Sequence, residues 1–302
     1  MKQQTKAEIH FLTKAVYKEL LSANPYIDQL ITIDKEITEV VQQLKEQQYD
    51  AIIDLHHNLR TTRLGLALGV KRHAFHKLNT EKWLLTNLKV NRMPPLHIVD
   101  RYLDTVARFG VTNDGKGLDH FIPEAEQISI ARAGLPDRFI AIAIGGKYVT
   151  KRLPEHKVSA VIAQLNLPVV LLGGPEDQPI GQRIAAALSK PITNGCGRFT
   201  VNQSAAVIAQ SAGLITNDTG MMHIGAALKR PVVSVWGNTV LAFGMTPYFP
   251  DGWTDSAIIE DRSVGCRPCS KLGYDVCPKG HFACMEQLNP DLIAEAGNRL
   301  FK

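Results

Sequence analysis

One stretch of the sequence decides the fold, and it reads Gly213-Leu-Ile-Thr-Asn-Asp-Thr-Gly-Met-Met-His-Ile-Gly-Ala-Ala-Leu-Lys-Arg-Pro-Val-Val-Ser-Val-Trp-Gly237. An apolar strand, a short polar turn, a helix and a second apolar strand follow one another here. This order is typical of a parallel sheet with crossover helices. The turn Asn217-Asp-Thr-Gly220 falls where the first strand ends. Because α/β proteins bind ligands beyond the carboxyl ends of their strands, this turn is the first candidate site.

The residues of the turn suit an anionic ligand. Asp218 or Thr219 is expected to cap the next helix, so that the amides of its first turn face the space beyond the strand. A helix N-terminus attracts phosphate through these amides and its dipole. Gly220 has no side chain to obstruct the backbone, and His223 lies one turn on, on the same helix face. Ordinary capping, with His223 as a half-buried side chain, is the competing interpretation.

Strand and helix patterns alternate through almost the whole chain, which predicts an α/β fold with two Rossmann-like lobes and parallel sheets. A turn-rich stretch at Val111–Pro123 suits a domain boundary. We therefore expect an amino-terminal lobe at residues 1–125, a second lobe at 126–288 and a C-terminal helix at 289–302. One option is that this helix packs back on the first lobe. The expected strands are Glu8–Leu12, Asp28–Ile33, Ala51–Leu55, Phe139–Ile144, Val169–Leu172, Gly213–Thr216 and Val232–Trp236. The expected helices are Ala15–Leu21, Thr38–Gln47, His97–Phe109, Pro154–Leu165, Pro179–Leu188, Gln203–Gln210, Gly220–Leu228 and Pro290–Phe301.

Composition limits the class of protein. The 302 residues are 45% hydrophobic and 21% charged, as in a folded domain, and no apolar run reaches the roughly 18 residues that span a bilayer. The first 13 residues lack the apolar core of a signal peptide, and cysteines are few, which favours a cytoplasmic location. There is no Walker-type or G-x-S-x-G motif, and the string Gly195–Thr200 does not fit a dinucleotide site.

Charge is unevenly distributed along the chain. The net charge of +5 is too mild to indicate nucleic acid as a partner. Between Leu55 and Arg92, however, eight basic residues stand against one acidic residue, Glu81. Such a segment can be an ordinary solvated surface, or it can be a patch that binds an anionic acceptor or an anionic membrane surface. The sequence fits both equally well.

Several motifs together resemble one known family. They are Asp218-Thr-Gly-x-x-His223-x-x-Ala226-Ala-Leu-x-x-Pro231, Lys151-Arg-Leu-Pro154, Gly173-Gly-Pro-Glu-Asp177, Ala51-Ile-Ile-Asp-Leu-His-His-Asn-Leu-Arg60 and the loop from Cys266-Arg-Pro-Cys269 to Cys284-Met285. The chain thereby resembles glycosyltransferase family 9, the ADP-heptose:lipopolysaccharide heptosyltransferases, over nearly its whole length. The resemblance implies a GT-B fold and inverting transfer of a heptose or related sugar from a nucleotide-sugar donor, with no required cofactor. The implied acceptor is an anionic lipid-linked oligosaccharide such as the lipopolysaccharide core. Peripheral contact with the inner face of the cytoplasmic membrane is compatible with it.

The resemblance also implies roles for individual residues in the second lobe. Lys151 and Asp218 are the expected catalytic residues: Lys151 neutralises charge on the phosphates and Asp218 contacts the transferred sugar. The amides of Thr219 and Gly220 hold the donor pyrophosphate, with His223 on the same helix face. Asp177 or Glu176 meets the ribose hydroxyls, and Phe199 lies against the adenine. Charge that builds up on a departing nucleoside diphosphate must be met by a cation and fixed dipoles, which agrees with these roles.

One part of the family pattern is not visible. Members open with a strand and a Gly-Asp loop that supplies the general base, whereas this chain starts close to the segment that follows, Lys6–Thr13. A truncated sequence is therefore one expectation, and a non-catalytic sugar-nucleotide-binding protein is the alternative. The nearest replacements for the base are Asp54, His56 and His57, at the end of a neighbouring strand.

Four of the five cysteines form a cluster, Cys266, Cys269, Cys277 and Cys284, with His281 between the last two. The first pair has C-x2-C spacing, which suits a structural zinc site, but the second pair lacks it. Reduced thiols that simply pack a loop explain the cluster equally well. Both interpretations, and therefore the metal-binding role of these residues, stay open at this point.

Overall fold

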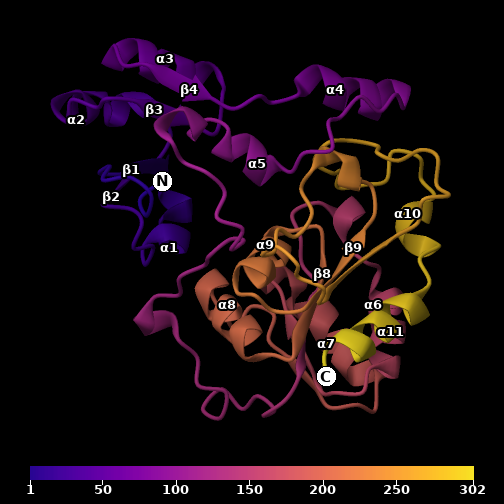
Figure 1. The fold of residues 1–302 in the computed structure, drawn as a ribbon. Helices are drawn as coiled ribbons and strands as arrows, with labels where there is room; N and C mark the ends of the chain where they lie inside the picture. Colours follow the sequence, from indigo (N-terminus) through magenta and orange to yellow (C-terminus); the bar gives the residue numbers. More distant parts are fainter. The chain divides into compact units, whose positions relative to one another are not determined.

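The chain passes between two structural units three times along its length. A computed structural model describes all 302 residues. The first unit is made of Met1–Asn79 and Pro95–Asp114, and the second of Thr80–Pro94 and Gly115–Lys302. Each unit is built from parallel strands and helices (Figure 1).

The first unit contains two separate pairs of parallel strands, β1–β2 and β3–β4. Ile31, Ile33 and Leu64 lie in its small hydrophobic core. Its strands are β1 (His10–Lys14), β2 (Gln29–Ile33), β3 (Ile52–Asp54) and β4 (Arg72–Ala74). Its helices are α1 (Lys18–Leu21), α2 (Val41–Glu46), α3 (Leu59–Leu68) and α5 (Ile98–Leu103), with 3-10 turns at Ala15–Tyr17, Ile37–Glu39 and Ala107–Phe109.

The second unit is organised around one six-stranded parallel sheet with the order β10-β9-β8-β5-β6-β7. The first strand of the unit, β5, thus stands in the middle, and the chain winds outward from it on both sides. This is the doubly wound arrangement of dinucleotide-binding folds, with its switch point between β5 and β8. The strands are β5 (Ile140–Ala143), β6 (Val169–Leu172), β7 (Ile192–Asn194), β8 (Gly213–Asn217), β9 (Val232–Trp236) and β10 (Ser256–Glu260).

Helices cover both faces of this sheet, because its strands are apolar on both sides. Successive residues of β8 point to opposite faces of the sheet. Leu214 packs beneath α8 and α9 on one face, and Ile215 packs beneath α6 and α11 on the other. C-terminal helix α11 packs on α6 and the sheet of its own unit. The helices are α4 (Asn79–Trp83), α6 (Glu155–Gln164), α7 (Gln178–Ala187), α8 (Val201–Gln210), α9 (Gly220–Ala227), α10 (Ala283–Glu286) and α11 (Pro290–Leu300), with a π-helical turn at Leu84–Leu88 and short 3-10 turns at Glu124–Glu126, Val149–Lys151, Pro175–Asp177 and Leu241–Phe243.

The expected strands and helices are all present, with ends displaced by a few residues or broken by short 3-10 turns. The sequence patterns missed the strands β4, β7 and β10. Strands β4 and β7 have three residues each, which are too few to show periodicity. The patterns also missed helix α3, although Asn58 caps it by accepting a hydrogen bond of 3.0 Å from the amide of Thr61.

The cysteine-rich loop is fixed to the sheet at its root by Arg267. The buried Arg267 guanidinium donates hydrogen bonds to the carbonyls of Gly237, Asp261 and Thr239, and pairs with Glu260 at 2.9 Å. These partners follow strands β9 and β10, so a single side chain joins the loop to the carboxyl ends of two neighbouring strands.

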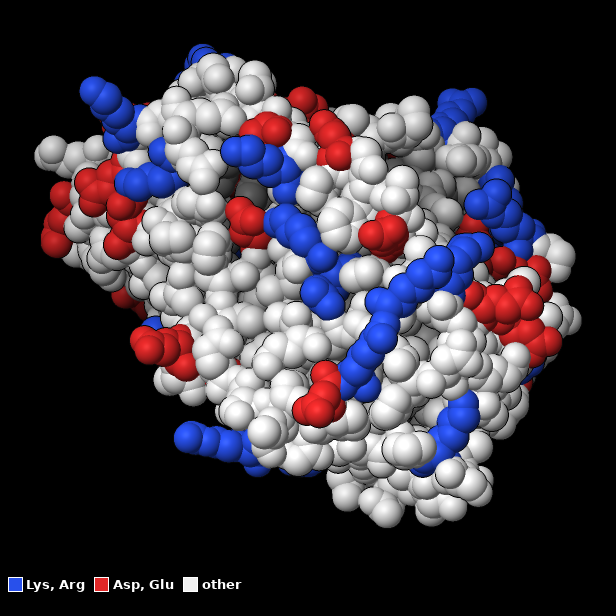
Figure 2. All heavy atoms as spheres, turned by 60° about the horizontal axis from the view of Figure 1, so that its bottom comes forward, with Lys and Arg blue, Asp and Glu red and all other residues white.

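No helix has the length and apolar character needed to cross a lipid bilayer. On the face that Figure 2 shows, Lys and Arg side chains form runs with Asp and Glu side chains beside them. This mixture differs from the uniform basic surface typical of nucleic-acid-binding proteins.

Candidate functional site

The switch point of the second unit brings the two predicted catalytic residues into one place. Strands β5 and β8 are neighbours in register, with Ala143 opposite Thr216. Lys151 ends the 3-10 turn that follows β5, and Asp218 comes directly after β8. The connections leaving these strands diverge to opposite sides of the sheet, which leaves room for a ligand at their carboxyl ends.

Lys151 and Asp218 form an ion pair. The ammonium nitrogen of Lys151 lies 2.6 Å from Oδ2 of Asp218 and also donates to the Asp218 main-chain carbonyl at 3.2 Å. The carboxylate is buried and most of the ammonium is shielded from solvent. The structure therefore brings these two residues together and holds a cation at the end of β8.

Polar side chains around the pair hold it in position. Thr239, which follows β9, donates a hydrogen bond of 2.7 Å from its hydroxyl to Oδ2 of Asp218. Asn217 accepts a hydrogen bond of 3.0 Å from the amide of Leu153, which ties the end of β8 to the segment carrying Lys151. All these groups are buried or nearly so. Buried polar groups with satisfied partners form rigid networks, so the pair is preorganised.

Helix α9 begins beside this pair with an open N-terminus. Thr219 is its N-cap residue, and the Thr219 side chain makes no capping hydrogen bond. Asp218 does not cap the helix, because its carboxylate is committed to Lys151 and Thr239. A Cβ atom placed on the exposed Gly220 would meet nothing within 4 Å, so the space beside this residue is open. The amides and the positive dipole end of such a helix N-terminus suit an anionic ligand. His223 is half-buried one turn further on.

The Gly173–Asp177 turn gives its two carboxylates different environments. Asp177 is 1% exposed, pairs with Arg152 at 3.0 Å and accepts the amide of Gly174 at 2.9 Å. Arg152 in turn donates to the carbonyl of Gly146 at 2.6 Å. Asp177 therefore joins two loops at the carboxyl edge of the sheet, while Glu176 next to it is exposed to solvent.

Phe199 lies in the loop after β7, at the same edge of the sheet. Its ring is half-buried against the core beneath α8, and the Arg198 guanidinium carbon stands 5.1 Å from the ring centroid. Packing on the core and the contact with Arg198 account for the position of this ring.

Comparisons with known proteins agree with this geometry. The model of glycosyltransferase family 9 (heptosyltransferase) matches residues 37–274. The chain belongs to glycosyltransferase family 9. It is 25% identical over 274 residues to lipooligosaccharide heptosyltransferase 2 of Haemophilus influenzae, covering 84% of this chain and 77% of that protein.

Solved family 9 structures share the fold. ADP-heptose lipopolysaccharide heptosyltransferase II of E. coli superposes with a TM-score of 0.73 at 22% identity, covering 99% of this chain and 91% of that one. An E. coli heptosyltransferase solved with ADP gives a TM-score of 0.61 at 18% identity, covering 85% of each chain. The GT-B type of α/β fold is therefore confirmed, and this family 9 member is a glycosyltransferase.

Asp54 has a structural role in the first unit of this family 9 chain. Burial would raise the pKa of Asp54, but the His57 amide, the Thr61 side chain, the His56 amide and the Arg72 guanidinium together lower it below its usual value. The Arg72 guanidinium lies 2.6 Å from the carboxylate. A carboxylate with a lowered pKa accepts protons poorly at neutral pH, which argues against Asp54 as the general base.

The structure gives no support for a metal site at the clustered cysteines of this glycosyltransferase. No group of three or more His, Cys, Asp or Glu side chains is placed to hold a metal ion. The zinc interpretation is therefore unsupported. Burial raises the pKa of Cys284 to about 11, and burial followed by the neighbouring Cys266 raises that of Cys269 to about 11.

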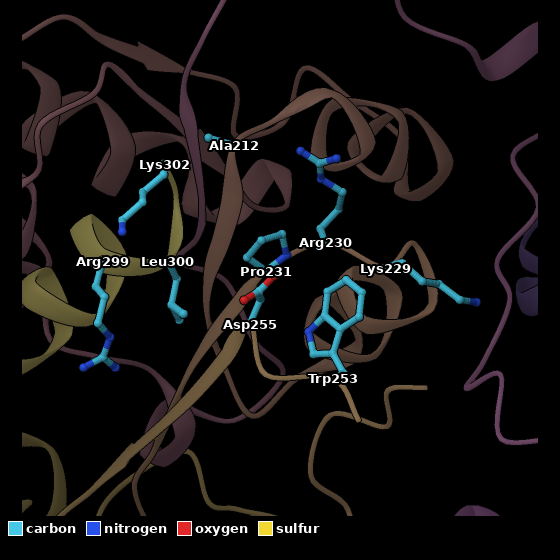
Figure 3. Close-up of a pocket in the computed structure, with 9 residues that line it drawn as sticks. All are labelled: Ala212, Lys229, Arg230, Pro231, Trp253, Asp255, Arg299, Leu300 and Lys302. Atoms are coloured by element: carbon cyan, nitrogen blue, oxygen red, sulfur yellow. The ribbon is translucent and has the colours of Figure 1, made fainter. Parts of the chain in front are cut away.

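A cavity of about 550 Å³ lies at the opposite edge of the same sheet. Residues directly before β8, β9 and β10 line it, so it lies at the amino ends of these strands. Figure 3 shows that its basic side chains point away from one another, and they do not converge on a common ligand position. The lining residues are Ala212, Lys229, Arg230, Pro231, Trp253, Asp255, Arg299, Leu300 and Lys302.

Sequence reasoning did not assign three residues that organise the site: Arg152, Asn217 and Thr239. Arg152 and Asn217 lie inside the motifs named above, but their partners lie far away in the chain. Position in the chain is the signal that could have found all three residues, because Asn217 ends a strand of the central sheet, and Arg152 and Thr239 follow such strands.

Proposed function

We propose that this family 9 enzyme transfers a heptose from ADP-heptose to the lipopolysaccharide core, with inversion at the anomeric carbon. One observation carries the proposal: the Lys151–Asp218 pair lies beside the uncapped N-terminus of α9 at the switch point. The names of the relatives support the sugar and the acceptor, and the family 9 structure solved with ADP supports the nucleotide.

The donor diphosphate is assigned to the amides of Thr219 and Gly220. Lys151 stands close enough to this helix end to share its ammonium with a diphosphate oxygen. A cation and fixed dipoles aimed at the leaving group stabilise the charge that develops as ADP departs. Their contribution grows in the transition state, which is the condition for accelerating the reaction.

Asp218 is assigned to the sugar that is transferred. A bound diphosphate competes with Asp218 for Lys151. The Asp218 carboxylate can then accept a hydrogen bond from a sugar hydroxyl. Thr239 keeps Oδ2 of Asp218 in place during this exchange. In the reaction the acceptor hydroxyl oxygen forms a bond to the anomeric carbon on one face and loses its proton to water. The bond between this carbon and the phosphate oxygen breaks on the other face, and ADP leaves with its electron pair.

The nucleoside is assigned to the neighbouring loops. Glu176 is the exposed carboxylate and is the better partner for ribose hydroxyls, whereas Asp177 shapes the turn that presents it. Phe199 offers a ring face to adenine. His223, on the face of α9 next to the diphosphate, is assigned a supporting contact to the donor.

The acceptor is assigned to the cytoplasmic membrane surface, since lipopolysaccharide core is carried on lipid. The proposal therefore includes work at the inner face of that membrane through a peripheral contact.

The deciding experiment incubates the purified enzyme with ADP-heptose and a heptose-deficient lipopolysaccharide acceptor. Mass spectrometry is expected to show one added heptose, and NMR is expected to show an anomeric configuration opposite to that of the donor. UDP- and GDP-sugars serve as controls for the nucleotide. Retained configuration, or faster transfer from another nucleotide sugar, would overturn the corresponding part of the proposal.

A further inference from the structure

Helix α4 and the turn after it expose apolar side chains in the second unit. Trp83 is 55% exposed and Leu88 is 57% exposed, whereas Leu85 between them is buried. The segment therefore packs one face on the unit and turns an aromatic and an aliphatic side chain outward. Large apolar side chains exposed together mark interaction sites more often than single ones do.

The tip of the cysteine-rich loop has the same character. Leu272 is 55% exposed and Val276 is 75% exposed, and Tyr274 between them is also exposed. Lys271 and Lys279 flank these residues and are exposed as well. Two basic side chains thus flank a group of exposed apolar side chains on a loop whose root is fixed by Arg267.

The two segments are joined by Lys89. Its ammonium nitrogen donates to the carbonyl of Cys266 at 3.0 Å and to that of Pro268 at 2.7 Å, within the root of the loop. The same nitrogen also bonds the carbonyl of Thr86 at 2.8 Å, at the end of the helical segment. We define the apolar-basic surface as residues 80–92 and 271–280, which both belong to the second unit. In Figure 1, α4 lies next to the orange and yellow chain that forms this loop.

The charge of the apolar-basic surface is positive, with five basic residues against two acidic ones, Glu81 and Asp275. Exposed Trp, Tyr and aliphatic side chains next to Lys and Arg suit the interface of a lipid bilayer, where rings sit at headgroup level. Basic residues add attraction to anionic lipids. A protein partner would be expected to bury the apolar residues without needing the basic excess.

The apolar-basic surface adjoins the candidate site. The amide of Tyr274 donates to the hydroxyl of Thr150 at 2.8 Å, and the Thr150 amide donates to the carbonyl of Tyr274 at 3.1 Å. Thr150 directly precedes Lys151. A membrane bound at this surface would therefore lie next to the donor site, where a lipid-carried acceptor must arrive.

We propose that the apolar-basic surface docks this enzyme on an anionic lipid bilayer, with Trp83, Leu88, Leu272 and Val276 inserting among the headgroups. The binding of lipid itself does not depend on the proposed function. The purpose given to it, access to a lipid-carried acceptor, rests on the proposed function.

The test is flotation with vesicles of phosphatidylcholine containing phosphatidylglycerol, compared with vesicles of phosphatidylcholine alone. The wild-type enzyme is expected to float with the anionic vesicles and much less with neutral ones. The double variant Leu272→Ser/Val276→Ser and the double variant Lys271→Glu/Lys279→Glu are each expected to lose at least about tenfold in vesicle affinity. Leu292→Ser is the matched control, because Leu292 on α11 is 52% exposed, and it is expected to float like the wild type.

Tryptophan fluorescence gives a second measurement. Trp236 is buried and Trp253 is half-buried, so a blue shift on adding anionic vesicles is expected to arise from Trp83 and to vanish in Trp83→Phe. Wild-type protein that stays free of anionic vesicles, or surface variants that float unchanged, would overturn the inference.

Transfer to a delipidated core oligosaccharide separates this inference from the proposed function. The surface variants are expected to keep normal rates on that soluble acceptor while losing rate on acceptor in vesicles. Vesicle binding without any transfer would contradict the proposed function alone, and transfer without vesicle binding would contradict docking alone.

Discussion

Lys151 and Asp218 are 67 residues apart in the chain, yet the ammonium and a carboxylate oxygen lie 2.6 Å apart beyond the carboxyl ends of the two central strands. The pair places a cation next to the amides that open α9. Without a ligand Asp218 holds the cation in position, and a diphosphate would replace part of that interaction. Each partner thus prepares the other for catalysis.

Lys151→Ala is expected to lower kcat about a hundredfold, the usual scale for losing one group that stabilises developing negative charge. Steady-state kinetics with ADP-heptose measures the effect. Lys147→Ala is the control, since Lys147 is an exposed lysine in the same loop with its ammonium 5.4 Å from the ring of Tyr148. Equal rates in the two variants would remove Lys151 from the mechanism.

Gly220→Ala is expected to weaken ADP binding by about tenfold without unfolding the enzyme. The added methyl group meets no protein atom within 4 Å, so it costs little in the free protein, but it occupies the space assigned to the diphosphate. Calorimetric titration with ADP measures the affinity. Gly265→Ala also enters open space, away from α9, and is expected to bind ADP normally. Unchanged affinity in Gly220→Ala would place the diphosphate elsewhere.

Thr239→Val is expected to reduce both stability and rate. The variant leaves Oδ2 of the buried Asp218 with Lys151 alone, which costs about 1–3 kcal/mol of unfolding free energy. Urea denaturation gives the stability loss, and the kinetics are expected to show a fall in kcat larger than any rise in KM. Thr239→Ser, which keeps the hydroxyl, is expected to restore most of the rate.

The two neighbouring carboxylates Glu176 and Asp177 are expected to respond differently to removal of charge. Glu176→Gln should raise the Kd for ADP several-fold and leave stability within about 0.5 kcal/mol, because the side chain is exposed. Asp177→Asn should lower stability by about 1–3 kcal/mol, because Arg152 loses its buried partner. The reverse result would assign the ribose contact to Asp177.

Alkaline pH is expected to destabilise the protein through its buried thiols. Burial raises the pKa of Cys284 to about 11 and that of Cys196 to about 12, while a thiol in the unfolded chain ionises near 9. The unfolded state therefore loses protons first, and the stability present below pH 9 declines as the pH rises toward these values. The decline is about 1 kcal/mol per thiol by pH 10. Urea denaturation between pH 8 and pH 10, with reductant present, should show a shallower decline for Cys284→Ala.

The sequence was sufficient to locate the site because strand ends carry its chemistry. Lys151, Asp218, Thr219 and Gly220 each follow a clearly apolar strand, and parallel strands bring their carboxyl ends together. The strand pattern predicted that these ends would share one edge of the sheet, and the resemblance to family 9 singled out Lys151 and Asp218 there.

Which side chains pair with one another at the site could not be predicted from the sequence. Nothing in Gly173–Asp177 shows that Arg152 takes Asp177 and leaves Glu176 exposed, since this depends on how two loops approach in space. The cysteine spacing likewise allowed a metal site, whereas the folded chain places no group of three or more His, Cys, Asp or Glu side chains to hold a metal ion.

Arg267 separates the cysteine-rich loop into a fixed root and a variable tip. Its guanidinium satisfies three main-chain carbonyls and a carboxylate, so the root survives whatever side chains the tip carries. Substitutions within residues 271–280 are therefore expected to leave the root of the loop and the neighbouring site in place. Chimeras that exchange only this decapeptide between family members should fold, and they offer a route to moving acceptor preference from one enzyme to another.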